Sequence, residues 1–123
     1  NETALKFREM AHLPAFSYGL EEILHGPLTG VNKIDTVYLF PSVKPPQFES
    51  EKFLYLERMK TLIQSLEKVG CKIIVPRFPK TILNAAQPLA AYWHAMLYLY
   101  WGQWTALGVA YQEKVNPDIN PYL

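Results

Sequence analysis

The chain has 123 residues, half of them hydrophobic, and its 12 basic and 11 acidic side chains leave a net charge of +1. This length allows one domain with a modest core. The balanced charge, without a basic run, excludes the electrostatic footprint of a nucleic-acid-binding protein. The single cysteine, Cys71, excludes an internal disulfide framework. With no signal peptide ahead of the first helix, we expect a reducing, cytoplasmic setting in which Cys71 is a buried, inert thiol.

A short helix over residues 4–10 is the first predicted element, and Asn1 is a possible cap for it. On that helix Glu2, Lys6 and Glu9 occupy the i, i+4 and i+7 positions, which lie on one face. Taken alone, such a row is typical of exposed ion pairs, which contribute little to stability. The spacing by itself therefore favours a solvated face.

A second short helix is predicted over residues 19–25. Ser17 is a possible N-cap for it, and acidic residues in its first turn suit the N-terminus of a helix. Gly26 and Pro27 end it, because glycine tolerates left-handed geometry and proline disfavours helix in the residue before it. We therefore expect His25 close to the end of a helix, where a surface or capping role is the alternative to a catalytic one.

From residue 31 onward the pattern alternates between strand and helix. Apolar runs at residues 35–41 and 71–76 predict two buried parallel strands. Between them, residues 53–69 carry apolar side chains at helical spacing, and Gly70 is expected to end that helix. The three segments predict one β-α-β unit with a right-handed crossover.

Two parallel strands do not form a stable sheet by themselves, because their apolar faces and both edges need cover. We therefore predict an α/β fold in which residues 1–123 are part of a doubly wound, three-layer α/β/α parallel sheet. The expected element order is helix, helix, strand, helix, strand, helix. The remaining strands would lie on sequence outside this chain.

The last predicted helix lies in a stretch without charged residues, between Lys80 and Glu113. Its length would suffice to span a bilayer. Polar residues and a proline within the stretch, and the lack of flanking basic clusters, argue against a membrane protein. A helix that packs on the sheet and on a partner subunit accounts better for its many aromatic residues. We expect at least one interface anchor among Trp93, Trp101 and Trp104.

Two further histidines suggest no metal site. His94 lies among apolar residues of the last helix and has no His, Cys or carboxylate at the i±3 or i±4 positions. A core or interface position is therefore favoured over a ligand role. His12 belongs to no motif, and the chain contains no glycine-rich phosphate-binding fingerprint.

Two motifs in the first thirty residues resemble a known family. The pattern E-x-A-L-K-x-[KR]-E covers residues 2–9, and the histidine of H-G-P follows sixteen residues after Glu9. This pair resembles the sugar isomerase (SIS) domain, and it is most similar to the isomerase half of glucosamine-6-phosphate synthase and to the fructosamine-6-phosphate deglycases. The resemblance extends more weakly to N-P-D at residues 116–118. It implies that residues 1–123 are the C-terminal half of a SIS-type phosphosugar-binding domain.

The resemblance implies a phosphosugar isomerase or deglycase that acts on a ketose or fructosamine 6-phosphate by acid–base catalysis. On the matching positions, Glu9 would be the base that moves a proton between C1 and C2. His25 would be the acid or base for ring opening or for the leaving group. Lys6 and Glu2 would support the Glu9 carboxylate and its charge. The resemblance also implies a homodimer or higher homo-oligomer, since the H-G-P histidine reaches a neighbouring subunit's site, and it requires no metal or organic cofactor.

Two departures from the synthase bear on the choice of activity. Leu24 stands where the synthase has a lysine, and Lys114 precedes the N-P-D, whereas the synthase's Schiff-base lysine lies in the tail after its last helix. A deglycase is therefore the first prediction, and the isomerase domain of a glutamine-fructose-6-phosphate aminotransferase is an alternative. A non-catalytic sugar-phosphate-binding SIS domain and a structural dimerisation fragment are the others. The presence of both Glu9 and His25 argues against a role in binding alone.

Overall fold

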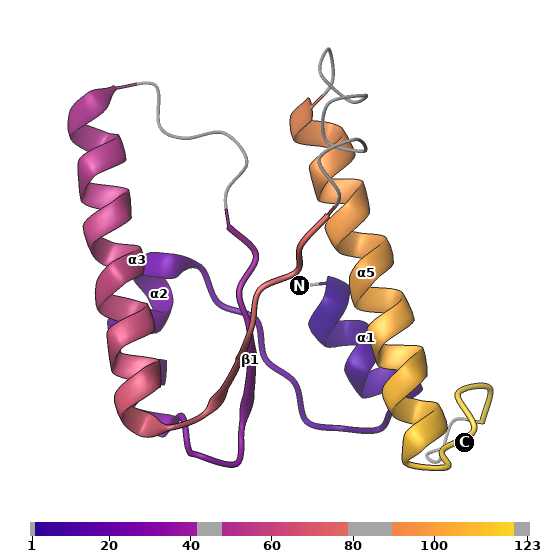
Figure 1. Cartoon of the computed structure of the whole chain (residues 1–123). Coiled ribbons are helices and arrows are strands. Elements are labelled where there is room, and N and C mark those ends of the chain that lie inside the picture. The colour runs from indigo at the N-terminus through magenta and orange to yellow at the C-terminus, as the bar shows by residue number, and fades with distance from the viewer. Residues whose placement is uncertain (1, 42–47, 79–89, 120–123) are drawn as a thin grey trace. The chain divides into compact units, whose positions relative to one another are not determined.

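The structure, a computed structural model, describes residues 2–41, 48–78 and 90–119 of the chain (Figure 1). Within these residues the order of helices and strands is the predicted one, with one additional 3-10 helix. The elements are α1 (Glu2–Met10), α2 (Leu20–Leu24), the 3-10 helix η1 (Pro27–Gly30), β1 (Thr36–Tyr38), α3 (Glu49–Val69), β2 (Lys72–Ile74) and α5 (Ala90–Gln112).

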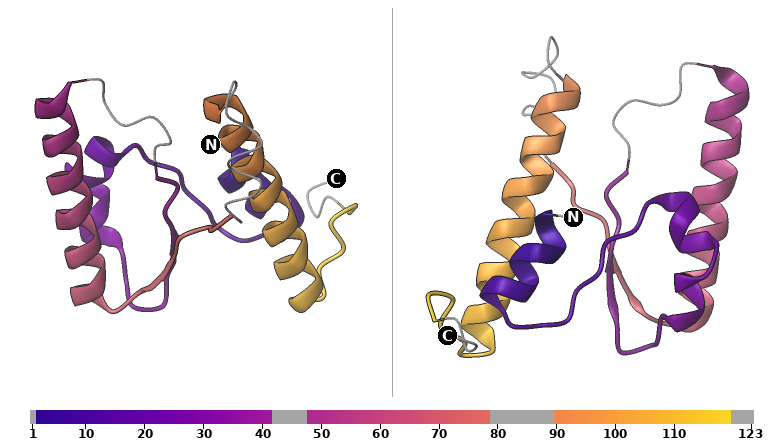
Figure 2. Two further views of the ribbon diagram at one scale, coloured as in Figure 1. Left: turned by 45° about the horizontal axis from the view of Figure 1, so that its top comes forward. Right: turned by 180° about the vertical axis from the view of Figure 1, so that it is seen from behind.

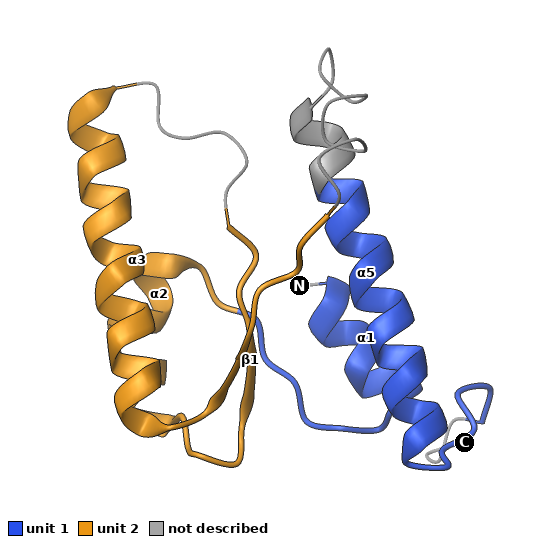
Figure 3. Cartoon of the chain, in the orientation of Figure 1, with its two compact units in different colours: residues 1–17, 92–123 blue, residues 18–91 orange. Residues whose placement is uncertain are grey.

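The chain folds into two compact units, which Figure 3 shows in different colours. Unit 1 consists of residues 1–17 and 92–123, and it contains α1 and most of α5. Unit 2 consists of residues 18–91, and it contains α2, η1, both strands and α3. Each unit has its own packing, and each is described here by itself.

Unit 2 is a mixed helix–strand unit built on a two-stranded parallel sheet. The strands are connected through α3, as parallel pairing requires a crossover. Each strand has three residues and occupies the middle of its predicted run, 35–41 or 71–76. The paired residues are Thr36 with Lys72, Val37 with Ile73 and Tyr38 with Ile74.

A small apolar core joins α3 to the sheet and to α2. Leu62 and Leu66, one turn apart on α3, are buried together with Leu39 and Cys71, which flank the strands. Their burial stabilises unit 2 because apolar surface leaves water. Further apolar residues pack on this cluster while remaining partly exposed. They are Leu20, Ile23, Leu24, Leu28, Val31, Val37, Ile63, Val69 and Ile73.

The helix α3 ends where the sequence predicted and begins earlier. Gly70 adopts the left-handed conformation, with φ of 77°, and its N–H donates to the carbonyl of Leu66 at 3.0 Å. Glycine is favoured there because it has no Cβ to oppose a positive φ. The predicted start at residue 53 is wrong, because the helix begins at Glu49. Acidic side chains in that first turn interact favourably with the positive end of the helix dipole.

The cap of α2 also differs from the prediction. Gly19, not Ser17, is the N-cap residue, and its backbone N–H donates to Oε2 of Glu22 at 3.0 Å. The Glu22 carboxylate, three residues after the N-cap, thus satisfies a backbone N–H at the start of the helix. At the other end α2 stops at Leu24, and Pro27 opens η1, as the H-G-P sequence led us to expect.

Unit 1 pairs α1 with α5, and the two views of Figure 2 show the helices side by side. Ala106 and Ala110 of α5 are completely buried, and Gly102 is one turn earlier on the same face. A methyl group at Gly102 would lie 2.7 Å from Cγ2 of Thr3. Small residues on α5 therefore allow α1 to approach its backbone closely. Ala4, Phe7 and Ala11 are the buried residues on the α1 side.

The helix α5 has 23 residues, none of them charged. A membrane-spanning helix is the alternative interpretation of this uncharged part of the sequence. Among the residues that the structure describes, no helix combines the length and the apolar character needed to cross a bilayer.

Candidate functional site

The predicted row of charges on α1 forms as expected. Nζ of Lys6 donates a hydrogen bond to Oε2 of Glu9 at 2.7 Å and lies 3.6 Å from Oε1 of Glu2. The i, i+4 and i+7 spacing along the helix brings the three side chains together on one face. The Glu9 side chain is 48% exposed. Its carboxylate is therefore held by a hydrogen bond and still accessible to a molecule in solution.

The electrostatics of this row favour a permanent positive charge beside Glu9. The hydrogen bond to the Glu9 carboxylate raises the pKa of the Lys6 ammonium above its ordinary value, and the charges of Glu9 and Glu2 act in the same direction. Lys6 therefore stays protonated over the physiological pH range. A charge-assisted hydrogen bond of this length orients a carboxylate well, so Lys6 holds the Glu9 side chain in a defined position on α1.

His25 lies at the C-terminal end of α2, where its backbone N–H donates to the carbonyls of Glu21 and Glu22. The imidazole is 75% exposed, and its Nε2 lies 3.9 Å from Oε2 of Glu21, four residues earlier. The structure thus places His25 at the surface of unit 2, next to a carboxylate.

The two predicted catalytic residues belong to different compact units. Glu9, with Glu2 and Lys6, is part of unit 1, whereas His25 is part of unit 2. The structure brings the three residues of α1 together. His25 lies in unit 2, with neighbours of its own.

Sequence reasoning placed acidic residues near His25, but it missed Arg58, which pairs with Glu21. The other oxygen of Glu21, Oε1, lies 3.6 Å from Nε of Arg58 on α3. The i, i+4 spacing of Glu21 and His25 is a signal that the sequence contained. Arg58 had no such signal, because the packing of α2 on α3 alone brings it to Glu21.

An open groove of about 530 Å³ lies between the start of α2 and the first half of α3. Its surface is mainly apolar, with carboxylates at its edge. None of the four predicted site residues lines it. The lining residues are Gly19, Leu20, Glu21, Glu22, Glu51, Leu54 and Tyr55.

The remaining polar residues considered from the sequence are Cys71, His12 and His94. Cys71 is buried, burial raises the pKa of its thiol, and its Sγ donates to the carbonyl of Leu66 at 3.6 Å. His12 follows α1 with φ of 54°, and its buried Nε2 has no hydrogen-bond partner among the described residues. The side chain of His94 lies outside the described residues. In the described part of the chain, no three His, Cys, Asp or Glu side chains form a group that could hold a metal ion.

The N-P-D segment forms a turn after α5. Oδ1 of Asn116 accepts a hydrogen bond from the backbone N–H of Asp118 at 3.0 Å, a local arrangement that asparagine commonly makes. Lys114, which precedes this turn, has a left-handed backbone conformation with φ of 57°. Its position before the turn is the departure from the synthase pattern.

Comparisons of this chain with protein-family models, with curated proteins and with solved structures find no match.

Proposed function

We propose that the chain is the C-terminal half of a SIS-type domain in a phosphosugar isomerase or deglycase. The observation that carries the proposal is the row of Glu2, Lys6 and Glu9, in which Lys6 Nζ donates to the Glu9 carboxylate at 2.7 Å. This row matches the family motif residue by residue. It also provides what proton abstraction needs, a carboxylate that is oriented by a neighbour and open to a ligand.

The sheet of unit 2 supports the proposed doubly wound, three-layer α/β/α fold. Two three-residue strands form a parallel pair, and parallel sheets are normally larger and covered on both faces. Phe40 and Val75, which follow the two strands, are exposed apolar residues. Additional strands and helices of the same domain would cover these surfaces.

Ring opening is the first proposed chemical step, and it is the role of His25. In a cyclic ketose 6-phosphate, the anomeric hydroxyl loses a proton while the bond from C2 to the ring oxygen breaks and that oxygen gains a proton. An imidazole can take part in both transfers near neutral pH. The exposed position of His25 at the end of α2 leaves it accessible for this task.

Proton transfer between C1 and C2 is the second proposed step, and Glu9 is its base. Glu9 takes a proton from C1, the electron pair of that bond forms a C1–C2 double bond, and the C2 oxygen gains a proton. A proton then returns to C2 while the oxygen on C1, or the nitrogen on C1 of a fructosamine, loses its proton and forms a double bond to C1, which completes the isomerisation. In a fructosamine substrate this leaves an imine at C1, which water hydrolyses to an aldose 6-phosphate and an amine. Lys6, and through it Glu2, would hold Glu9 in place.

The separation of Glu9 and His25 between two units is compatible with the proposal. In the related enzymes the H-G-P histidine serves a neighbouring subunit, and we therefore propose a homodimer or higher homo-oligomer with shared sites. These proton transfers need neither a metal nor an organic cofactor. The proposed substrate is a sugar phosphate, and the proposed location is the cytoplasm.

The test is exchange of the C1 or C2 proton with deuterated water, followed by NMR on a panel of ketose and fructosamine 6-phosphates. It uses the protein that contains the complete domain. We expect Glu9→Gln to lower the exchange rate by roughly 10²–10⁴-fold, the usual contribution of a general base, with substrate binding largely kept. Glu57→Gln is the matched control, because Glu57 is also a half-exposed helical carboxylate with a lysine three residues away. It should exchange as fast as the unchanged protein.

His25→Asn should slow the reaction more for a cyclic substrate than for one supplied in the open-chain form. Release of amine from a fructosamine 6-phosphate without glutamine identifies a deglycase. Formation of glucosamine 6-phosphate in the presence of an amino donor identifies an aminotransferase. If no substrate of the panel exchanges a proton, or if Glu9→Gln exchanges at the unchanged rate, the enzymatic proposal is wrong. Sugar-phosphate binding without exchange would identify a binding domain.

A further inference from the structure

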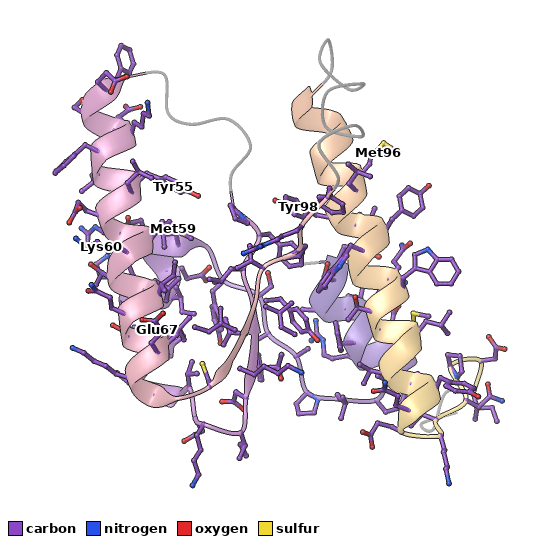
Figure 4. All side chains as sticks on the ribbon, viewed as in Figure 1. Tyr55, Met59, Lys60, Glu67, Met96 and Tyr98 are labelled. Carbon is purple, nitrogen blue, oxygen red and sulfur yellow. The ribbon has the colours of Figure 1, made fainter. Side chains whose placement is uncertain are left out.

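One face of α5 is apolar, aromatic and exposed. Met96, Tyr100, Trp104 and Tyr111 recur at intervals of four and seven residues, which places them on the same side of the helix. They are 44%, 53%, 71% and 85% exposed, respectively. Figure 4 shows Met96 leaving α5 on a different side from Tyr98. These four residues are called the aromatic face.

The aromatic face is distinct from the face that packs on α1. Gly102 and Ala106 on the α1 side are each two residues away from Trp104, and two residues correspond to about 200° of rotation along a helix. The pairing of α1 with α5 buries Ala106 completely while Trp104 remains mostly exposed. The packing of unit 1 therefore leaves the aromatic face available for a partner.

The chemistry of α5 restricts the kind of partner. The helix contains no charged residue, so it offers no charge complementarity to an acidic or a basic protein. A helix that lies in a membrane interface usually carries lysine or arginine on its polar face, and α5 has none. Tyrosine and tryptophan combine apolar area with a polar atom at one end, which suits them to protein–protein interfaces. A neutral surface of this kind can pack on itself without repulsion.

We propose that the partner is a second copy of this chain, bound through the same face in a two-fold symmetric contact. In such a contact each residue of the patch meets the same patch on the other copy, so a neutral and self-complementary surface is suitable. The resemblance to a family implied an oligomer without identifying a surface. The structure assigns Trp104 to the centre of that surface, with Tyr100 one turn before it and Tyr111 at its end.

The size of the aromatic face agrees with a weak dimer. With the exposed fractions given above, its four side chains offer on the order of 600 Å² in each copy, because a large aromatic side chain contributes about 150–250 Å². Two copies would bury on the order of 1,200 Å², which is the lower limit for a specific interface. An interface at this lower limit is expected to be weak and reversible, so association should depend on protein concentration.

Sedimentation velocity of the chain over concentrations of about 1–200 μM tests the proposal. The expected result is a reversible monomer–dimer equilibrium that responds little to sodium chloride, since no ion pair takes part. Trp104→Glu should raise the dissociation constant at least about 100-fold, because each dimer loses two central anchors and gains two buried charges. Tyr111→Glu, at the end of the face, should have a smaller effect. Phe53→Glu is the matched control, since Phe53 is an equally exposed aromatic residue on α3.

Circular dichroism of each variant establishes that it is folded before its association is measured. The proposal is overturned if the unchanged chain is monomeric at every concentration, or if Phe53→Glu abolishes association while Trp104→Glu does not. It is also overturned if the chain stays monomeric and binds phosphatidylcholine–phosphatidylglycerol vesicles through Trp104. Association requires neither Glu9 nor His25. A dimer without enzymatic activity would therefore refute the proposed function and leave this inference intact.

Discussion

The closest approach between α1 and α5 gives a prediction in which two similar substitutions have opposite effects. Gly102 and Gly108 are both interior residues of α5, so that replacement by alanine improves helix propensity equally, by about 0.8–1.0 kcal/mol. At Gly108 a new methyl group has no heavy atom within 4 Å. At Gly102 it would lie 2.7 Å from Cγ2 and 2.9 Å from Cβ of Thr3, and closer still to Oγ1.

The clash at Gly102 cannot be relieved by a flexible side chain. Threonine is β-branched and has little rotamer freedom in a helix, so α1 itself has to move away from α5. Overpacking of this kind typically costs about 1–3 kcal/mol. We therefore expect Gly108→Ala to raise the free energy of unfolding of unit 1 by up to about 1 kcal/mol. We expect the free energy of unfolding of Gly102→Ala to be about 1–3 kcal/mol lower than that of Gly108→Ala.

Urea unfolding followed by far-ultraviolet circular dichroism measures both variants under the same conditions. The double variant Thr3→Gly, Gly102→Ala, compared with Thr3→Gly alone, provides the internal control, because it removes all three Thr3 side-chain atoms that the new methyl group would meet. It should recover most of the stability lost in Gly102→Ala. If Gly102→Ala stabilises the chain as much as Gly108→Ala does, then α1 does not pack on α5 at this position.

Two further predictions concern titration and thiol reactivity. The free energy of unfolding should fall as the pH rises above about 9. Burial raises the pKa of the Cys71 thiol above 9.0 and that of Tyr38 above 10.0, and the hydrogen bond to Glu9 raises that of Lys6 above 10.5, so the unfolded chain loses these protons first. Urea unfolding at pH 8, 10 and 11 checks this. The free energy of unfolding of Tyr38→Phe should decrease less over this range than that of the unchanged chain. An increase in stability above pH 10 would contradict these pKa assignments. The Cys71 thiol, which is buried and has a raised pKa, should react slowly with a disulfide reagent in the folded chain and at the rate of a free thiol in urea. Rapid labelling without urea would mean that the Leu66–Cys71 core opens readily.

Several features of the fold were predictable because they depend on nearby residues. The helical spacing of apolar side chains predicted α3, and Gly70 marked its end because glycine readily adopts the left-handed conformation observed there. The two apolar runs predicted a parallel pair of strands, which the structure contains. The face shared by Glu2, Lys6 and Glu9 was predictable because residues three and four apart on a helix are neighbours.

The sequence did not predict the ends of elements that depend on competition between caps. Ser17 was a reasonable N-cap for α2 by residue type, but Glu22 satisfies the backbone N–H of Gly19 instead. The start of α3 at Glu49 was also missed, because the prediction followed the apolar side chains at helical spacing, which was read from residue 53 onward. These errors of two to four residues arise where two local signals are of similar strength.

Contacts between residues far apart in the sequence were decided by tertiary packing alone. The approach of Thr3 to Gly102 depends on how α1 lies on α5, and the ion pair of Glu21 with Arg58 depends on how α2 lies on α3. No periodicity within either helix encodes such a meeting, since each partner obeys its own 3.6-residue repeat whatever it packs against. The sequence by itself therefore determined the helices, the strands and the charged row on α1. The tertiary structure decided which faces of those helices are covered, and it left the aromatic face of α5 exposed because the small residues of that helix turn its other side toward α1.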